Sequence, residues 1–372
     1  MRTRHDSLVF TAVVSVAVVL GAGVMIAVLA VSGAPGVVLL ALALAAVPVG
    51  PLLAAYLWLD RYEPEPRSLL ASGLLWGAVV ATAAALLIDG VGGLVVPLTG
   101  DTGLVVVTPL VEEAAKGAFL LMLLWWRRAE LDGILDGLVY AGMVGIGFAF
   151  TENVLYLIAA WNGTDALGPG GLVGVTGTFV LRCVLSPFAH PLFTAFTGLG
   201  VGLAVSSRHG AVRVGAPLVG YTTAVIAHAV WNAATVQGLG LFAGVYVVLF
   251  LPALAVLVGI AVWARSSERR LLATALADAA ARDLLPATDI GWVVDLRARR
   301  AARAHAAAVG GPGAARAMAQ YQQAVIELGF LHHRLLRGTP PQDWQDRGAD
   351  HVARIRRLRP HIAFPGQVVP VA

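Results

Sequence analysis

The sequence is poor in charged residues, and lysine is almost absent from it. Charged side chains make up 13% of the 372 residues, whereas hydrophobic side chains make up 58%. Soluble globular domains carry about 25% charged residues, so this composition excludes an ordinary soluble fold. The mean hydropathy of +0.79 agrees with that exclusion. We therefore expect an all-α polytopic membrane protein.

Several familiar catalytic signatures are also missing. The single cysteine, Cys183, excludes an intramolecular disulfide, and its apolar surroundings predict a small packing residue. The sequence contains no Gly-x-Ser-x-Gly, no Gly-x-Gly-Asp and no His-Glu-x-x-His motif. These absences argue against a serine hydrolase, an aspartyl intramembrane protease and a zinc protease of the common helical type.

Apolar runs long enough to cross a bilayer recur through the first 264 residues. We expect eight spans, at about 7–31, 36–59, 68–92, 102–126, 137–161, 172–206, 214–237 and 241–263. The first run is too long for the core of a signal peptide, so we expect it to be retained. Pro187 and Pro191 interrupt 172–206, which is either two short helices or one crossing with an interfacial or re-entrant lead-in.

Basic residues in the loops set the expected topology. Arginines lie in the segments 1–6, 60–67, 127–132 and 206–213, whereas the other short loops contain no lysine or arginine. If the basic loops are cytoplasmic, the segment 172–206 crosses the membrane an odd number of times. A single crossing gives eight spans with both termini in the cytoplasm.

The C-terminal part of the chain differs in charge from the rest. Residues 1–264 carry 10 basic and 13 acidic side chains, and residues 265–372 carry 16 and 9, a net charge of +7. We expect a small cytoplasmic module with helices at about 267–284, 287–309, 314–336 and 343–358. It has no aromatic-basic motif, so no nucleic acid is expected and a protein is its candidate partner. We expect His332 and His333 to be a solvated pair.

Three charged residues interrupt the apolar run 102–126. Glu112 and Glu113 lie four and three residues before Lys116, the only lysine in the chain, so on a helix this ammonium can pair with either carboxylate. A charge at bilayer depth costs from about 2.5 to over 10 kcal/mol and is rarely present without a role. The spacing therefore predicts a site.

Further polar residues lie within other expected spans. They are Glu152, which shares a helix face with Phe148 and Tyr156, then Arg182 and His190, and then His228 with Asn232 at i, i+4. At about 1.5 Å per residue, Glu112, Glu152 and His228 lie roughly 14–15 Å from the outer ends of their spans, and His190 roughly 6 Å. These depths are compatible with one site in the outer half of the membrane. Asp89 and Asp136 lie near span ends, where we expect structural roles.

Two glutamate-based chemistries fit these residues. In the first, a glutamate is the general base for water, a histidine holds or donates a proton, and Asn232 or a histidine stabilises the oxyanion. In the second, Glu152, His190 and His228 bind zinc, and Glu113 deprotonates a water on the metal. The sequence leaves both open.

Taken in order, these residues match a known pattern. It consists of Glu-Glu-x-x-Lys, Asp-Gly-x-x-Tyr with Gly-x-Gly-Phe-x-x-x-Glu-Asn-x-x-Tyr, Arg with Pro-x-x-His, and His-x-x-x-Asn. Over about residues 50–240 the chain resembles the PrsW family of bacterial intramembrane proteases, which looks related to the CAAX prenyl proteases and the Abi membrane proteins. The positions that carry the resemblance are Asp60, Glu63, Pro64, Glu65, Pro66, Glu112, Glu113, Lys116, Asp136, Gly137, Tyr140, Gly145, Gly147, Phe148, Glu152, Asn153, Tyr156, Arg182, Pro187, His190, His228 and Asn232.

The resemblance implies an intramembrane endopeptidase of the bacterial cytoplasmic membrane, with its protease core in residues 1–264. It implies catalytic roles for Glu112, Glu113, Glu152, His190, His228 and Asn232, with support from Lys116, Phe148, Asn153 and Arg182. The family is labelled as metalloproteases, whereas its relatives are also described as metal-independent glutamate proteases. Its founding function is cleavage of a single-span anti-sigma factor, which implies a single-span membrane protein as substrate.

Two other functions use the same residues. In a proton- or solute-coupled transporter, buried Glu, His and Lys residues form a relay, usually within a chain that contains internal repeats. We find no such repeat in the sequence. In a non-enzymatic sensor or scaffold, the buried charges fix helix packing and the tail 265–372 binds a partner.

Overall fold

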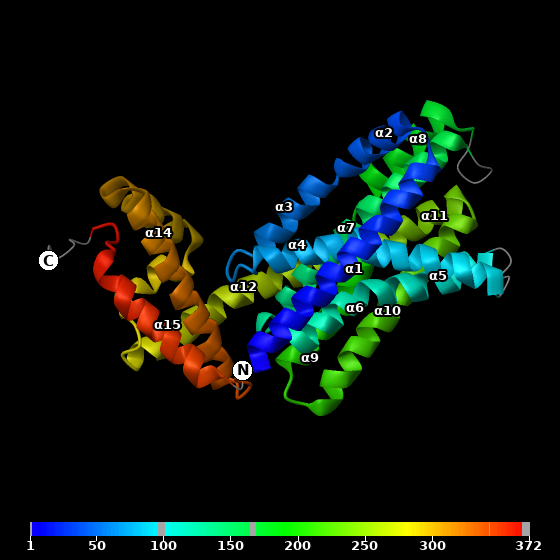
Figure 1. The fold of residues 1–372 in the computed structure, drawn as a ribbon. Helices are drawn as coiled ribbons and strands as arrows, with labels where there is room; N and C mark the ends of the chain where they lie inside the picture. Colours follow the sequence, from blue (N-terminus) through cyan, green and yellow to red (C-terminus); the bar gives the residue numbers. More distant parts are fainter. Residues whose placement is uncertain (1, 96–100, 164–168, 342, 367–372) are drawn as a thin grey trace. The chain divides into compact units, whose positions relative to one another are not determined.

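The computed structural model describes residues 2–95, 101–163, 169–341 and 343–366, and within these ranges it contains helices and no β-strand (Figure 1). The chain forms two compact units. The membrane unit comprises the residues up to Asp60 and Glu65–Ala261, and the C-terminal unit comprises Arg61–Pro64 and the residues from Val262 onward. The expected all-α class is therefore confirmed.

The helices of the membrane unit follow the apolar runs of the sequence. They are α1 (Arg2–Ser32), α2 (Pro35–Ala46), α3 (Val49–Leu59), α4 (Arg67–Leu75), α5 (Thr82–Val95), α6 (Thr108–Trp126), α7 (Ile134–Asn162), α8 (Gly171–Phe179), α9 (Ala189–Ser206), α10 (Gly210–Val236), α11 (Leu239–Val245) and α12 (Leu251–Ala281), the last of which continues into the C-terminal unit. Four π-helical segments extend or join them, at Trp76–Ala81, Gly103–Val107, Val180–Leu185 and Tyr246–Phe250.

Seven stretches within the described residues are long and apolar enough to span a membrane. They are Ser7–Ser32, Pro35–Leu59, Arg67–Gly90, Ile134–Asn162, Gly171–Ser206, Gly210–Val236 and Leu239–Ala281. Each corresponds to one of the eight expected spans. The remaining expected span, 102–126, is also helical throughout, but Glu112, Glu113 and Lys116 set its composition apart. The count of eight and the cytoplasmic position of both termini stay predictions.

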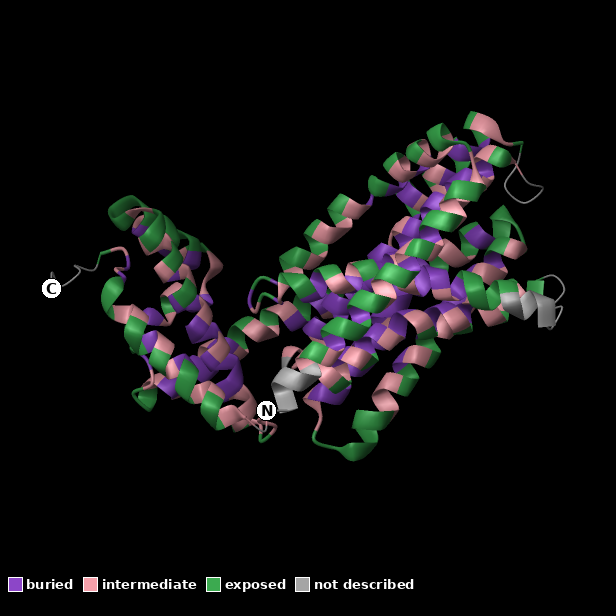
Figure 2. Ribbon diagram, in the orientation of Figure 1, coloured by how far each residue is buried: buried purple, intermediate pink, exposed green. Residues whose placement is uncertain are grey.

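Helix α7 is the buried centre of the membrane unit (Figure 2). Twenty-one of its 29 residues are buried. Its glycines bring neighbouring backbones into contact, because a Cβ at Gly147 would lie 1.9 Å from the carbonyl oxygen of Leu74 in α4. A Cβ at Gly145 would lie 2.7 Å from Cα of Pro191 in α9. The close approach expected from these glycines is confirmed, and it places α7 against the start of α9.

The segment 171–206 contains two helices with a break between them. The amide of Ser186 donates a hydrogen bond of 3.0 Å to the carbonyl of Leu181, five residues earlier. This bond closes the last turn of the π-helical segment. Helix α9 then begins at Ala189, so that His190 lies in its first turn. Pro187 at the break lacks an amide hydrogen, which accounts for the interruption.

The C-terminal unit is helical, as expected. Besides the end of α12 it contains α13 (Gly291–Val294), α14 (Leu296–Leu336), α15 (Trp344–Leu358) and short 3₁₀ turns at Ala287–Asp289 and Arg359–His361. Helix α14 is broken at Gly311, which has a φ of 71°, at the expected glycine-rich break. The core of the C-terminal unit surrounds Asp289, which accepts hydrogen bonds from Tyr321 (2.5 Å) and Arg359 (2.6 Å).

Two expectations for this unit were wrong. The range 287–309 is not one helix, because the Asp295 side chain accepts hydrogen bonds from the amides of Arg297 and Ala298 and starts a new helix there. His332 is not solvated: it is buried, and its Nε2 lies 2.6 Å from Oδ2 of Asp278. The apolar residues of α14 carry His332 inward, where this carboxylate satisfies it.

We expect Gly147→Ala to destabilise the protein by about 1–3 kcal/mol, because the added methyl group overlaps the Leu74 carbonyl. Gly23→Ala in α1 is the matched control, since a Cβ there meets no atom within 4 Å and alanine favours helix by up to about 1 kcal/mol. Thermal unfolding of both variants in detergent micelles measures the difference. Equal unfolding temperatures would contradict the close packing of α4 on α7.

Candidate active site

Lys116 lies at the centre of a buried polar cluster. Its Nζ is 2.8 Å from Oε1 of Glu113, 3.2 Å from Oε2 of Glu112 and 3.1 Å from Nδ1 of His190. The ring of Phe148 covers the ammonium, with its centroid 3.8 Å from Nζ. The lysine side chain is 0% exposed. The expected pairing is confirmed, and the lysine binds both carboxylates at once.

The helix that carries this triplet is fixed by its neighbours. Trp76 donates its indole N–H to the carbonyl of Ala115 at 2.9 Å, and Tyr221 donates its hydroxyl to the carbonyl of Leu110, also at 2.9 Å. Both bonds tie neighbouring helices to the backbone of α6 within one turn of the two glutamates. The carboxylates therefore belong to a part of the helix whose position is set from two sides.

His228 of α10 joins the cluster through Glu113. Its Nδ1 lies 3.0 Å from Oε1 of Glu113, and because a carboxylate only accepts, this nitrogen carries the proton. Its Nε2 lies 3.9 Å from Oε2 of Glu112, beyond hydrogen-bond distance. Phe193 stacks on the imidazole at 4.8 Å, with 17° between the rings. The stacking and the Glu113 bond together set the orientation of the ring.

His190 connects this cluster to a second one around Glu152. Its Nδ1 accepts from the Lys116 ammonium, so its Nε2 carries the proton and donates to Oε2 of Glu152 at 2.5 Å. Arg182 donates to the same carboxylate and to Oδ1 of Asn153, the latter at 2.8 Å. Its guanidinium lies over the ring of Tyr156, 3.9 Å from the centroid. Glu112 and Glu113 thus share the Lys116 ammonium, and Glu152 is paired with Arg182.

A small cavity adjoins this second cluster. It has a volume of about 20 Å³, and Asn153, Arg182, Ser186 and His190 supply polar groups to its wall. One water molecule needs about 10–15 Å³ and two to four polar partners. The cavity is therefore of a size and polarity that suit one water beside His190.

The polar hairpin before α4 forms a further group of acids outside the spans. The amide of Glu65 donates to both carboxylate oxygens of Asp60, at 3.1 and 3.2 Å, and Tyr140 donates its hydroxyl to Oε2 of Glu65 at 2.7 Å. Burial raises the pKa of Asp60 to about 7. Burial and the nearby Asp136 raise the pKa of Glu65 well above its usual range. Since Glu65 is bonded to Tyr140 of α7 and Asp60 is bonded to the amide of Glu65, we interpret both acids as structural.

Among the described residues, one group of four could hold a metal ion. One ligand atom each from Glu112, Glu113, His190 and His228 lies within 4.8 Å of the others, and all four residues are buried. Carboxylate and imidazole groups are the ligands that zinc takes in catalytic sites. The second carboxylate oxygen of Glu113, Oε2, is buried without a hydrogen-bond partner among the described residues. The donor chemistry therefore fits a divalent cation.

The Lys116 ammonium already contacts most of the residues that would bind the metal ion. Its Nζ is within 3.2 Å of three of the four residues, so it occupies the place where a metal ion would reach them. This group also differs from the expected set of Glu152, His190 and His228. Glu152 contacts Nε2 of His190, whereas Lys116, which also binds Glu112 and Glu113, contacts Nδ1 of the same ring.

Other candidates lie outside the cluster. Asn232 donates its side-chain amide to the carbonyl of Leu104 at 2.9 Å, and it makes no hydrogen bond to the other candidates among the described residues. Asp136 accepts from the amides of Asp132 and Gly133 at the start of α7, a structural role, as expected. Phe193 was not predicted from the sequence, although it contacts both histidine rings of the site. Its position three residues after His190, on the same helix face, was the available signal.

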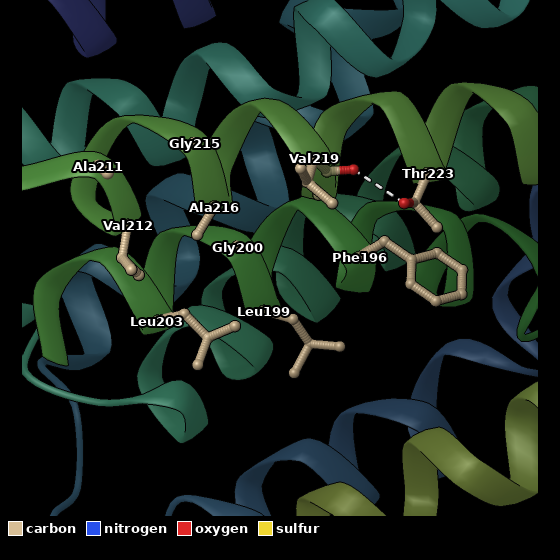
Figure 3. Close-up of a pocket in the computed structure, with 11 residues that line it drawn as sticks. Phe196, Leu199, Gly200, Leu203, Ala211, Val212, Gly215, Ala216, Val219 and Thr223 are labelled. Atoms are coloured by element: carbon tan, nitrogen blue, oxygen red, sulfur yellow. Dashed lines mark hydrogen bonds between the residues drawn. The ribbon is translucent and has the colours of Figure 1, made fainter. Parts of the chain in front are cut away.

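A separate groove between α9 and α10 contains none of these groups. It has a volume of about 480 Å³, and Figure 3 shows its apolar wall with small residues at the positions where the helices meet. The hydroxyl of Thr223 donates to the carbonyl of Val219 in its own helix at 2.8 Å. The groove therefore has an apolar wall, and none of the candidate catalytic side chains lines it. It is lined by Phe196, Leu199, Gly200, Leu203, Ala211, Val212, Gly215, Ala216, Val219, Gly220 and Thr223.

The part of the chain that contains the candidate site matches a known protein family. The model of the PrsW family of intramembrane metalloproteases matches residues 65–257. Protease PrsW of Geobacillus kaustophilus is 30% identical over 163 residues, which are 43% of this chain and 65% of that protein. The proteins of the same name from Oceanobacillus iheyensis and Bacillus subtilis are 35% identical over 95 residues and 36% identical over 93 residues.

These alignments cover part of each protein. The last two span 26% and 25% of this chain, and 37% and 36% of the relatives. The chain thus matches less than two thirds of the length of each of these three relatives. No solved structure matches the chain.

We expect Lys116→Met to destabilise the protein by about 3–5 kcal/mol, because it leaves two buried carboxylates without their cation. Adding Glu113→Gln to Lys116→Met should recover part of that loss, since it removes one uncompensated charge. Arg208→Met, at an exposed loop arginine, is the control and should change little. Unfolding in detergent micelles measures five proteins, namely wild type, Lys116→Met, Glu113→Gln, the double variant and Arg208→Met. If the losses of the two single variants simply add, the ion pair is not the source of the effect.

Proposed function

This chain belongs to the PrsW family of intramembrane metalloproteases, and we propose that it is an endopeptidase that hydrolyses a peptide bond of a membrane protein. One observation supports this activity most directly. A buried carboxylate, Glu113, has one oxygen held by Lys116 and His228 and the other without a partner among the described residues. A fixed carboxylate with a free acceptor oxygen is what a general base for water requires.

The residues of the cluster divide the proton transfers of hydrolysis among them. Oε2 of Glu113 accepts a proton from water as the water oxygen attacks the peptide carbonyl carbon. The departing amine takes up one proton as the C–N bond breaks, and Glu113, or His228 bonded to it, returns the proton. Lys116 stabilises the negative charge of Glu112, and that of Glu113 whenever Glu113 does not carry the transferred proton, and Phe193 keeps the imidazole of His228 in place.

His190, Glu152 and Arg182 form a supporting chain in this proposal. Arg182 holds Glu152, and Glu152 fixes the proton of His190 on Nε2. That leaves Nδ1 as an acceptor for Lys116. The family resemblance assigns Asn232 to catalysis. In this proposal its side-chain amide stabilises the oxyanion, after its hydrogen bond to the Leu104 carbonyl has broken.

A zinc ion bound by the four-residue group would act as a Lewis acid on the peptide carbonyl and acidify a bound water. Glu112, Glu113, His190 and His228 are the residues that would hold it. Because the Lys116 ammonium contacts three of them, we propose that the lysine and a metal ion are alternative cations for the same ligands.

The proposed substrate is a single-span membrane protein, with an anti-sigma factor as the specific candidate. The proposed location is the bacterial cytoplasmic membrane, with the tail from residue 265 in the cytoplasm. A transporter is less well supported, because the buried polar groups gather in two joined clusters instead of tracing a path. A pure scaffold would not need the free oxygen of Glu113.

We expect Glu113→Gln to reduce peptide hydrolysis by about 10²–10⁴-fold, the usual contribution of a general base. Glu130→Gln, the same substitution in the short turn between α6 and α7, is the matched control. The measurement is a comparison of new protein N-termini in membranes of cells that make each variant. Termini within or beside single-span helices should appear with wild type and Glu130→Gln, and be lost with Glu113→Gln.

Identical sets of termini for all three proteins under several envelope stresses would reject the protease proposal. Proton-linked solute flux that depends on Glu113 would then favour a transporter. Function that survives Glu113→Gln and requires residues 265–372 would favour a scaffold.

We expect zinc to raise the unfolding temperature of Lys116→Met more than that of wild type, because the variant frees three ligands from the ammonium. Metal content after dialysis provides a second readout. His228→Gln in the Lys116→Met background should abolish the gain, since it removes one proposed ligand. Equal zinc responses of wild type and Lys116→Met would refute the competition.

A further inference from the structure

The C-terminal unit contains an apolar groove outside the segment matched by the family model. It has a volume of about 760 Å³ and runs between the last part of α14 and helix α15. Leu328, Leu331 and Leu335 line it from α14. Their spacing of three and four residues is that of a single helix face. The groove is therefore bounded by one apolar face of α14, with α15 opposite.

Helix α15 leaves the groove open because its facing residues are small. Ala349 and Ala353 line the groove and are exposed, and Gly348 lines it between them and Trp344. A Cβ built at Gly348 would meet only the Leu331 side chain, at an ordinary contact distance of 3.7 Å. Nothing in the backbone of α15 therefore requires glycine at this position.

The dimensions of the groove match a short helix. Its lining extends from Leu328 to Leu336 along α14 and from Trp344 to Arg356 along α15. At 1.5 Å per residue these stretches are about 12 and 18 Å long. That is two to three turns, enough for anchors at i, i+3, i+4 and i+7 of a bound helix.

The ionisable residues that line the groove are all basic. Arg282, His332 and Arg356 are among its lining residues, which include no aspartate or glutamate. Asp278 pairs with both Arg282 (2.8 Å) and His332 (2.6 Å), so one carboxylate faces two potential cations. Arg356 has no hydrogen-bond or ion-pair partner among the described residues. An occupant with acidic groups beside its apolar face would complement this rim.

We propose that the groove binds an amphipathic helix of a partner protein, one with leucine-like anchors on one face and acidic residues on the flanks. The apolar anchors lie against the leucines of α14 and the alanines of α15. The acidic flank pairs with Arg356 and Arg282. This gives the C-terminal unit a docking function that is independent of the chemistry in the membrane unit.

Two synthetic 18-residue peptides test the proposal on the full-length protein in phosphatidylcholine nanodiscs. Both place leucines on one helical face, and the remaining positions are glutamate in one peptide and lysine in the other. Fluorescence anisotropy of labelled peptides, with empty nanodiscs as background, should show at least tenfold tighter binding of the glutamate peptide. A shuffled glutamate peptide without a leucine face should not bind.

Paired variants locate the binding. Ala349→Trp fills the groove, whereas Ala307→Trp places the same side chain at an exposed site of α14 outside it. Arg356→Glu reverses a rim charge, whereas Arg357→Glu changes an exposed neighbour that does not line the groove. The first member of each pair should weaken binding at least tenfold and the second should not.

Three results would overturn the proposal. They are equal affinity for the glutamate and lysine peptides, binding that Ala349→Trp leaves unchanged, and no binding of either peptide. A long-chain fatty acid that displaces the glutamate peptide completely, at concentrations below its own micelle formation, would identify an anionic amphiphile as the occupant instead. Dimerisation of the full-length protein that Ala349→Trp abolishes would identify a second copy of the chain.

Discussion

The site depends on a single ammonium held among acids in an apolar environment. Lys116 Nζ contacts Glu112, Glu113 and His190, and it is the only lysine in the chain. Removing either carboxylate from water costs several kcal/mol, which their attraction to the lysine offsets only if its geometry is maintained. The glycine-mediated approach of α7 to α4 and α9, and the Trp76 bond to the backbone of α6, maintain that geometry. The close packing of the backbones around the site thus determines whether the charges are tolerated.

The sequence predicted the residues of the site better than their partners. Helical spacing placed Lys116 beside both glutamates, and it placed Phe148, Glu152 and Tyr156 on one face, because these are relations within one helix. Contacts between helices depend on rotation and depth, which spacing does not give. That is why the Glu152–Arg182 pair, the stacking of Phe193 and the bond of Asn232 to Leu104 emerged only from the structure.

In the fold, too, the sequence predicted local features correctly and missed contacts between residues far apart in the chain. Apolar runs predicted the helices, and Gly311 was found at the expected break of α14. The expectation for His332 was wrong, because its partner Asp278 lies 54 residues earlier in the chain and no local pattern connects the two.

The division of the chain into two units was also not predictable from neighbouring residues. The hairpin Arg61–Pro64 belongs to the C-terminal unit, although the residues on both sides of it belong to the membrane unit.

The π-helical segment Val180–Leu185 has a consequence for how tolerant this part of the chain is to change in length. A π turn holds one residue more than an α turn, and one residue corresponds to about 100° of rotation around the helix axis. Arg182 is the third residue of this segment and lies four residues before the break at Ser186. The extra residue therefore acts as a rotational adjustment that aims the guanidinium at Glu152. An insertion or deletion between the end of α8 and Arg182 would rotate this side chain about the helix axis, even when every residue of the site keeps its identity.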